Sequence, residues 1–235
     1  MTIPVIDLSG ALLPGGHPSL DVAVQIRAAA ESAGFFYIIH HGLEPHVVDR
    51  QFSLIEQLFD LPAERKEALS TRLSACSRGY EAIGSQTLDS DARPDLKESF
   101  YCGIDYPPEH PYVVRKYHTY GMNQWPAELP DLAADSAAYI GSMCRLSVRL
   151  MQLIALSLDL TEDYFDQMHG APMVTLRFLR YPPQPENADD RTFGAGAHTD
   201  WGAITILAQD AHGGLEVSMP DGSWVAAPPI AGSLV

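Results

Sequence analysis

The sequence has few cysteines and few basic residues. Its 3 Cys among 235 residues form no Cys-x-x-Cys pair, which argues against a disulfide framework and a thiolate zinc site. Fifteen Lys and Arg stand against 30 Asp and Glu, and the net charge of −15 repels phosphate backbones and anionic lipid. No run approaches the ~20 apolar residues of a membrane span, and residues 1–13 lack the pattern of a signal peptide. We therefore predict a cytoplasmic protein with no nucleic-acid or membrane partner; no oligomeric state is predicted.

The first two thirds of the chain show mainly helical periodicity. With 46% apolar and 19% charged residues, the composition is that of an ordinary globular protein. Apolar spacing, glycine and proline predict the following elements. They are a strand over 3–8, a turn over 14–18, a helix from Ser19 to Gly34, a strand over 35–40, a helix over 45–59 with Val48, Phe52, Ile55 and Phe59 on its buried face, a loop-rich segment over 71–130, and a long helix over 132–158.

The last third changes to a period of two, which is typical of strands. Strands are predicted over 173–181 and 203–208, and a hairpin over 215–218 and 224–227 turns at Pro220-Asp221-Gly222. Helices followed by a run of short strands indicate an α+β fold whose β part is a jelly roll or a barrel.

The main functional signal is the pair His198 and Asp200 within Gly196-Ala197-His198-Thr199-Asp200-Trp201-Gly202. In extended chain, residues i and i+2 point to the same side, so one imidazole and one carboxylate can bind one cation together. These donors suit Fe(II), Mn(II) or Zn(II), and two ligands leave the open positions that a catalytic metal needs. A bare His-x-Asp also fits a turn-capping or hydrogen-bonded pair, so its context has to decide.

That context resembles the isopenicillin-N-synthase-like branch of the non-haem iron(II), 2-oxoglutarate-dependent dioxygenases. The blocks that carry the resemblance follow the family's order over nearly the whole chain. They are 3–8 (IPVIDL), 34–42 (GFFYIIHHG), 59–66 (FDLPAERK), 78–80 (RGY), 95–100 (DLKESF), 123–126 (NQWP), 179–183 (LRYPP), 198–200 (HTD), 213–217 (GGLEV) and 221–224 (DGSW). Position 40 departs from the pattern, because His40 stands where the family more often has Asn.

The resemblance implies a distorted jelly roll, the double-stranded β-helix, preceded by a helical N-terminal region. It implies a non-haem dioxygenase N-terminal region over 1–118, a connecting long helix over 119–170 and a partial dioxygenase β-core over 171–235. It further implies Fe(II) as cofactor, 2-oxoglutarate and O₂ as cosubstrates, and a small-molecule substrate. His198 and Asp200 would be two members of the facial triad of two histidines and one carboxylate.

A third candidate is Tyr181, which matches the tyrosine that in many relatives hydrogen-bonds a bound carboxylate. The alternative is a half-buried tyrosine on a strand. Leu179 stands where many plant relatives carry Asn, which weakens transfer of a plant-type cosubstrate site. Among the other histidines, we expect His40 and His41 to support a turn and His212 to be solvated. Four residues either face a substrate or belong to the core or a lid: Phe100, Tyr101, Asn123 and Trp125. Arg177 is expected to reach the barrel interior.

The family's second metal histidine and its Arg-x-Ser anchor for 2-oxoglutarate belong to strands that follow the segment ending at Val235. We therefore expect the last strands to be missing from this chain and the full-length product to be the active oxygenase. Two alternatives remain open. One is an O₂-dependent iron oxidase of isopenicillin-N-synthase type that uses no 2-oxoglutarate, and the other is a non-catalytic fragment without a complete metal site.

Overall fold

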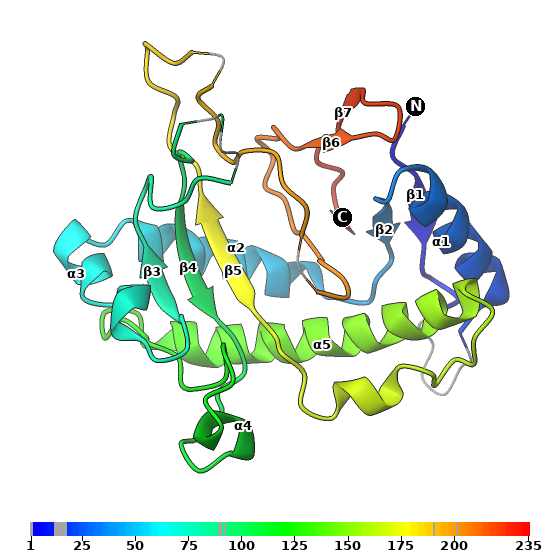
Figure 1. Ribbon diagram of the computed structural model, residues 1–235, viewed down its shortest axis with the longest axis horizontal. Helices are drawn as coiled ribbons and strands as arrows, with labels where there is room; N and C mark the ends of the chain where they lie inside the picture. The colour runs from blue at the N-terminus through cyan, green and yellow to red at the C-terminus, as the bar shows by residue number, and fades with distance from the viewer. Residues whose placement is uncertain (1, 12–17, 89–90, 92, 190, 201) are drawn as a thin grey trace. The chain divides into compact units, whose positions relative to one another are not determined.

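The computed structural model describes residues 2–11, 18–88, 91, 93–189, 191–200 and 202–235. Most of the predicted turn over 14–18, and Trp201, lie outside these residues. The elements in chain order are β1 Val5–Asp7, α1 Leu20–Ser32, β2 Tyr37–Ile39, α2 Pro45–Phe59, α3 Ala63–Glu67, η1 Thr71–Leu73, β3 Gly79–Glu81, β4 Glu98–Cys102, α4 Pro111–Val114, α5 Asp131–Ser157, η2 Asp166–His169, β5 Leu176–Arg180, β6 Glu216–Ser218, β7 Trp224–Ala226 and β8 Ser233–Leu234 (Figure 1).

The chain divides into two compact units. Unit 1 comprises Met1–Asp49, Gly141–Pro172 and Trp201–Val235, and unit 2 comprises Arg50–Ile140 and Met173–Asp200. Helices α2 and α5 contribute residues to both units. Each unit is therefore built from segments far apart in the sequence.

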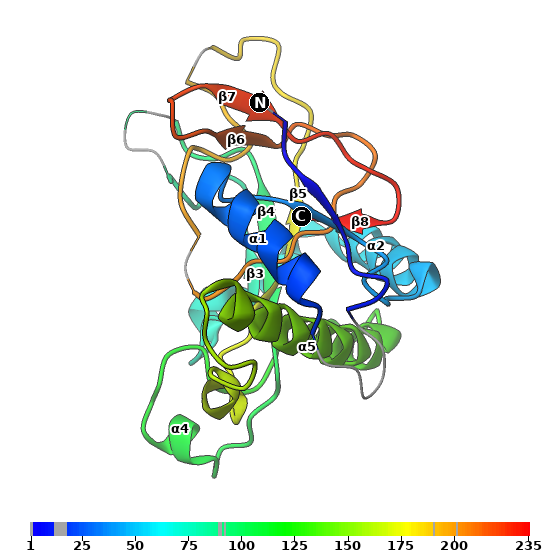
Figure 2. The ribbon, with the colours of Figure 1, turned by 90° about the vertical axis from the view of Figure 1, so that its right-hand side faces the viewer.

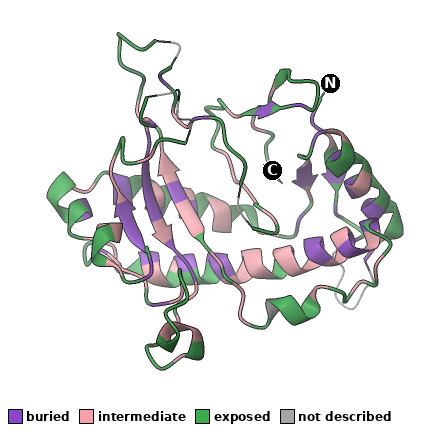
Figure 3. Ribbon diagram, in the orientation of Figure 1, coloured by how far each residue is buried: buried purple, intermediate pink, exposed green. Residues whose placement is uncertain are grey.

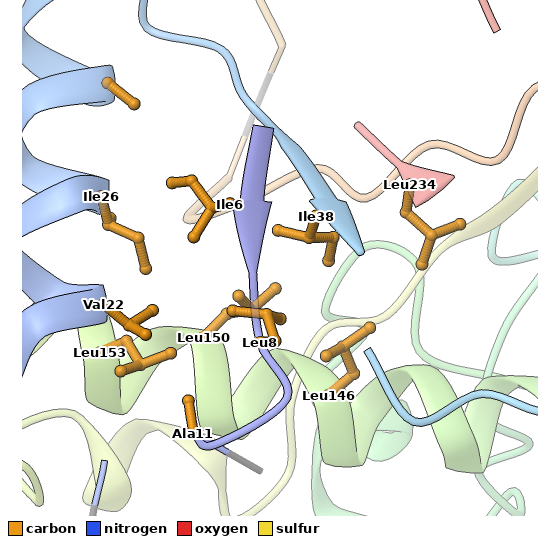
Figure 4. Close-up of a cluster of buried hydrophobic side chains, with 11 residues drawn as sticks. Ile6, Leu8, Ala11, Val22, Ile26, Ile38, Leu146, Leu150, Leu153 and Leu234 are labelled. Carbon is orange, nitrogen blue, oxygen red and sulfur yellow. The ribbon is translucent and has the colours of Figure 1, made fainter. Parts of the chain in front are cut away.

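Unit 1 contains a three-stranded sheet of order β1-β2-β8, in which β1 and β2 are parallel and β8 is antiparallel to β2. Helix α1 buries Val22, Ile26 and Ala29, as its periodicity predicts, and ends before Gly34, whose φ of +72° favours glycine. From α5, Leu146, Leu150 and Leu153 join the same core. Figure 4 shows these side chains pointing toward those of β1, β2 and β8.

Unit 1 also contains the predicted hairpin, formed by β6 and β7 (Figure 2). Gly222 has a φ of +81°, and the Asp221 carboxylate accepts hydrogen bonds from the Ser223 amide at 2.9 Å and hydroxyl at 2.6 Å. An Asx turn followed by a left-handed glycine is the chemistry that closes such a loop.

Unit 2 contains an antiparallel sheet of order β3-β4-β5, with Tyr80 opposite Phe100 and Phe100 opposite Phe178. Figure 3 shows buried residues in all three strands. Phe100 is fully buried, stacks on Phe178 with centroids 6.2 Å apart and contacts Trp125 at 6.0 Å. The prediction that 71–130 is loop-rich was thus incomplete, because β3 and β4 lie within it.

Two further predictions are corrected. No strand forms over 203–208; only Leu207 and Val235 exchange backbone hydrogen bonds, at 2.8 and 2.9 Å, while Ile204 and Ile206 pack on the unit 1 core. In α2 the most buried positions are Gln51, Leu54, Leu58 and Phe59, so the buried face is rotated by about one residue from the predicted one. Gln51 occupies a buried position because its amide donates to the Ser136 hydroxyl at 3.1 Å.

Candidate metal centre

The structure brings His198 and Asp200 together in unit 2. They lie on an irregular segment after β5 rather than on a strand, yet His198 Nε2 is 3.4 Å from Asp200 Oδ1. Both side chains are partly exposed, at 40% and 51%, so the pair faces solvent and leaves room for further ligands.

The second ring nitrogen of His198 fixes the tautomer. His198 Nδ1 lies 2.8 Å from the carbonyl oxygen of Gly196, which can only accept a hydrogen bond. Nδ1 therefore carries a proton, and Nε2, on the side of Asp200, is the nitrogen that the neutral imidazole would offer to a cation. Metal-binding histidines usually have this arrangement, in which one nitrogen donates to a carbonyl and the other is free to bind the cation.

A buried ion pair holds the backbone that carries this carbonyl. Asp95 is almost fully buried and accepts a hydrogen bond from the Gly196 amide at 3.0 Å. Its other oxygen pairs with the buried ammonium of Lys97. Burial lowers the pKa of Lys97, and the adjacent Asp95 opposes that effect. The contacts connect Lys97, Asp95, Gly196 and His198 in one continuous series.

The backbone supports the same arrangement. The Arg93 amide donates to Arg191 O and the Leu96 amide donates to Phe193 O, both at 2.9 Å. The segment before β4 and the segment before His198 are therefore bonded at several positions. This support limits how far the His198 backbone can move when a ligand binds.

Tyr181 follows β5 and packs against the same segment. A Cβ on Gly194 would lie 2.8 Å from Tyr181 Cδ1, so only glycine allows the ring this close. The residue is 51% exposed, and burial of its phenol raises the pKa of Tyr181 while the charge of Arg177 opposes this rise. Tyr181 is thus a half-exposed tyrosine whose ring packs against Gly194, four residues before His198.

The histidine interpretations agree with the structure. His40 Nδ1 contacts Asp7 Oδ1 at 2.9 Å, and His41 Nδ1 accepts from the Leu43 amide at 3.2 Å, so both support the turn after β2. The side chain of His212 is 90% exposed, and its Nδ1 lies 2.8 Å from Asp210 Oδ2.

The aromatic and polar candidate residues have different structural roles. Phe100 is buried in the core of unit 2, and Trp125 is half-buried against its ring. Asn123 connects two parts of the chain by bonding the Gly103 amide at 2.9 Å and carbonyl at 2.7 Å. Tyr101 lines a cavity in unit 2. Arg177 lies over the Tyr101 ring, with its Cζ 4.8 Å from the centroid, and donates to Gln86 Oε1 at 2.7 Å.

Asp95 and Lys97 lie in the family block 95–100, but the sequence predicts no functional role for either residue. Within the part of the chain that the structure describes, no group of three or more His, Cys, Asp or Glu residues could hold a metal ion. The candidate centre thus consists of one imidazole and one carboxylate. None of the described helices is both long and apolar enough to cross a membrane.

Comparison with known proteins identifies the class. Residues 3–128 match the family model described as non-haem dioxygenase in morphine synthesis N-terminal, and residues 171–235 match the 2OG-Fe(II) oxygenase superfamily. The chain belongs to the 2-oxoglutarate and Fe(II)-dependent oxygenases.

Individual relatives agree. The chain is 35% identical to the 2-oxoglutarate-Fe(II) type oxidoreductase hxnY of Emericella nidulans, over 99% of this chain and 68% of that protein. It is 40% identical to a 2-oxoglutarate-dependent dioxygenase of Didymella fabae, over 94% of this chain and 69% of that protein. The crystal structure of a full-length Neurospora crassa protein in complex with alpha-KG superposes with a TM-score of 0.84 at 29% identity, covering 99% of this chain and 71% of that one.

The protein is a non-haem iron oxygenase that uses Fe(II), 2-oxoglutarate and O₂. With 2-oxoglutarate and O₂, the bound metal supplies the oxidising chemistry that converts 2-oxoglutarate to succinate and CO₂ and oxidises the substrate. The donor set fits this metal, because Fe(II) in such enzymes takes imidazole and carboxylate ligands and keeps open positions. The chain itself places Nε2 of His198 3.4 Å from Asp200 Oδ1.

Proposed function

We propose that His198 and Asp200 are protein ligands of the catalytic Fe(II). One observation carries the assignment: His198 Nδ1 donates to Gly196 O at 2.8 Å, and the other ring nitrogen, Nε2, lies 3.4 Å from Asp200 Oδ1. The two side chains supply a neutral nitrogen and a hard anionic oxygen to one cation. Tyr181 is proposed as a hydrogen-bond donor to a carboxylate bound at this metal, since its ring packs on the segment that carries both ligands.

We further propose that β5 and the segments after it belong to a distorted jelly roll preceded by a helical N-terminal region. The proposed division is 1–118 for the N-terminal region, 119–170 for the connecting long helix and 171–235 for the β-core. The match of the oxygenase superfamily to 171–235 supports the last boundary. The substrate is proposed to be a small organic molecule; in support, the Neurospora crassa protein is also solved in complex with thymine.

The test is anaerobic Fe(II) binding followed by addition of 2-oxoglutarate. We expect the unchanged protein to bind Fe(II) and to develop the visible metal-to-ligand charge-transfer band of a chelated 2-oxo acid. His198→Ala and Asp200→Ala should lose both signals, because each removes one of the two ligands.

His212→Ala is the matched control, because His212 also pairs with a carboxylate two residues away, at 2.8 Å. It should bind Fe(II) as the unchanged protein does. Fe(II) binding that survives in both His198→Ala and Asp200→Ala would disprove the assignment.

A further inference from the structure

The three-stranded sheet of unit 2 has two unlike faces. Residues directly opposite each other in an antiparallel ladder point to the same face. Phe100 lies opposite Phe178 and both are buried, so one face of the sheet packs on the core. Tyr101 lies opposite Arg177 on the other face, where the Arg177 side chain is 27% exposed. This second face, called the open face below, is therefore polar and reached by solvent.

The open face leads to the segment that carries the candidate metal pair. Every second side chain of a strand points the same way, so Arg177, Leu179 and Tyr181 follow one another along β5 on this face. Burial raises the pKa of Tyr181 and the charge of Arg177 opposes this rise, in keeping with a position on one face. The Tyr181 ring packs against Gly194, four residues before His198. The open face thus has a cation at one end, an apolar residue in the middle and the metal segment at the other end.

The guanidinium of Arg177 is held in place by its neighbours. Its Nη2 donates to Gln86 Oε1 at 2.7 Å and to Ser99 Oγ at 2.9 Å, and its Nε donates to the same hydroxyl at 3.3 Å. The guanidinium lies over the Tyr101 ring, with Cζ 4.8 Å from the centroid. Because these contacts already order the side chain, a ligand that binds to it pays little for immobilising it.

The third nitrogen of this guanidinium, Nη1, is free. None of the residues that the structure describes accepts a hydrogen bond from Nη1, and this atom is not among the buried polar atoms that lack a partner. Glu81 Oε2 lies 3.9 Å from Nη2, too far for a hydrogen bond, and accepts from the Tyr101 hydroxyl at 3.0 Å. Nη1 therefore offers two N–H groups of a cation to a ligand on the open face.

We propose that Arg177 binds a carboxylate of the substrate, while the apolar body of the substrate lies over Leu179 and its oxidised carbon lies at the metal. The proposal rests on the proposed function, since it takes His198 and Asp200 as the metal end of the open face. Four residues of a strand advance about 13 Å, which separates the Cα atoms of Arg177 and Tyr181. The substrate class is therefore a small amphipathic carboxylic acid, oxidised at the end away from its carboxylate.

The experiment is isothermal titration of the chelator-treated, metal-free protein with hexanoate and with hexanamide, its uncharged analogue. We expect hexanoate to bind at least about tenfold more tightly, the factor that a charge-assisted hydrogen bond contributes. Arg177→Gln should bind hexanoate no better than hexanamide. Leu179→Asn should weaken both ligands, because it removes an apolar contact that they share. Arg115→Gln, which changes an exposed arginine at the end of α4 in the same unit, should change neither affinity.

Two further measurements separate the substrate from the cosubstrate, which also carries carboxylates. Arg177→Gln should leave the affinity of the Fe(II)-loaded protein for 2-oxoglutarate unchanged, as read from the charge-transfer band. With Mn(II) in place of Fe(II), the unpaired electrons of the metal should relax the terminal methyl protons of hexanoate faster than the protons next to its carboxylate. An equal loss of 2-oxoglutarate affinity, or the reverse order of relaxation, would overturn the proposal.

Circular dichroism establishes whether Arg177→Gln is folded. If it is not, Arg177→Lys decides, because it keeps the charge but has no second nitrogen to present in the place of Nη1, and it should lose hexanoate affinity several-fold. Equal affinities for hexanoate and hexanamide in the unchanged protein would overturn the proposal. So would a folded Arg177→Gln, or failing that an Arg177→Lys protein, that binds hexanoate as tightly as the unchanged one. The titration needs no metal, so an error in the assignment of His198 and Asp200 would appear in the Fe(II) experiment and not here.

Discussion

Unit 1 buries aliphatic side chains from α1, α5 and its three-stranded sheet, whereas unit 2 buries charged groups around its own sheet. At the centre of unit 2, the Glu98 carboxylate accepts from Lys66 at 2.7 Å, Tyr80 at 2.7 Å and Arg180 at 2.6 Å. Lys66 also donates to Phe59 O at 2.8 Å. An aliphatic core tolerates moderate changes in side-chain shape, but a buried ion network is strongly destabilised when one charged partner is lost.

The same unit carries the candidate metal pair and Arg177. Residues Lys66, Arg78, Asp95, Lys97 and Glu98 all lie within blocks that resemble the family in the sequence. These motif residues therefore act largely as buried support for the functional part of the chain, while unit 1 is stabilised by ordinary hydrophobic packing.

The largest expected effect comes from breaking the network of unit 2. Lys66→Met removes the buried ammonium and leaves Glu98 with less compensation, so we expect a loss of about 3–5 kcal/mol in the free energy of unfolding. Denaturant unfolding followed by circular dichroism measures it. Arg93→Met, which breaks the exposed pair with Asp189, is the control and should cost far less. Equal losses in the two variants would refute the contrast between buried and exposed pairs.

A slightly smaller effect is expected in unit 1. Leu153 is fully buried in its core, and Leu153→Ala should cost about 2–5 kcal/mol because it leaves a cavity. Leu158→Ala, at an exposed position after the same helix, should stay within about 0.5 kcal/mol of the unchanged protein. If Leu158→Ala proved as costly as Leu153→Ala, the core of unit 1 would be wrongly placed.

The pH dependence should distinguish the units further. Burial alone would raise the pKa of Glu98, but the hydrogen bonds from Lys66, Tyr80 and Arg180 outweigh it and lower this pKa below the reference value of 4.5. The ionised carboxylate therefore contributes stability above about pH 4.5 that is lost as the pH falls through the folded pKa.

Glu98→Gln should accordingly be less stable than the unchanged protein at pH 7, and the difference in melting temperature should shrink below pH 4.5. Glu109→Gln, at an exposed position, should show no such convergence. A gap between Glu98→Gln and the unchanged protein that stays constant from about pH 7 to about pH 3 would contradict the lowered pKa.

The smallest effect concerns support of the metal pair. Asp95→Ala removes the acceptor for the Gly196 amide, whereas Asp95→Asn keeps an acceptor oxygen there. We expect Asp95→Ala to weaken Fe(II) binding by about 10–100-fold and Asp95→Asn by less, since groups that orient metal ligands contribute at this level. Asp60→Asn, an exposed acid of unit 2, is the control. An unchanged Fe(II) affinity in Asp95→Ala would show that Asp95 does not support the metal pair.

Sequence patterns predicted the helices well because α1 and α5 repeat apolar residues every three or four positions. They missed β3 and β4, which are short and contain the buried polar residues Glu98 and Ser99, so the strand period is hidden. The opposite error occurred over 203–208, where a strand was predicted and none forms. The alternating apolar residues there pack on a core without a neighbouring strand.

In the candidate metal centre, the spacing of His198 and Asp200 correctly predicted that their side chains lie close together. Nothing in the sequence links Asp95 to Gly196, because 101 residues separate them and only folding brings them together. The burial of Arg78 could not be predicted either, since the sequence does not show which arginines are buried.

The most direct test of the metal assignment is ¹⁵N NMR of the histidine side chains during titration of the protein with Zn(II), a diamagnetic ion that accepts the same nitrogen and oxygen donors. We predict that Nε2 of His198 shifts to a metal-bound value at one equivalent while its Nδ1 stays protonated and His212 is unchanged. Coordination through Nδ1 of His198, or a metal-bound signal from His212 with His198 unaffected, would contradict it.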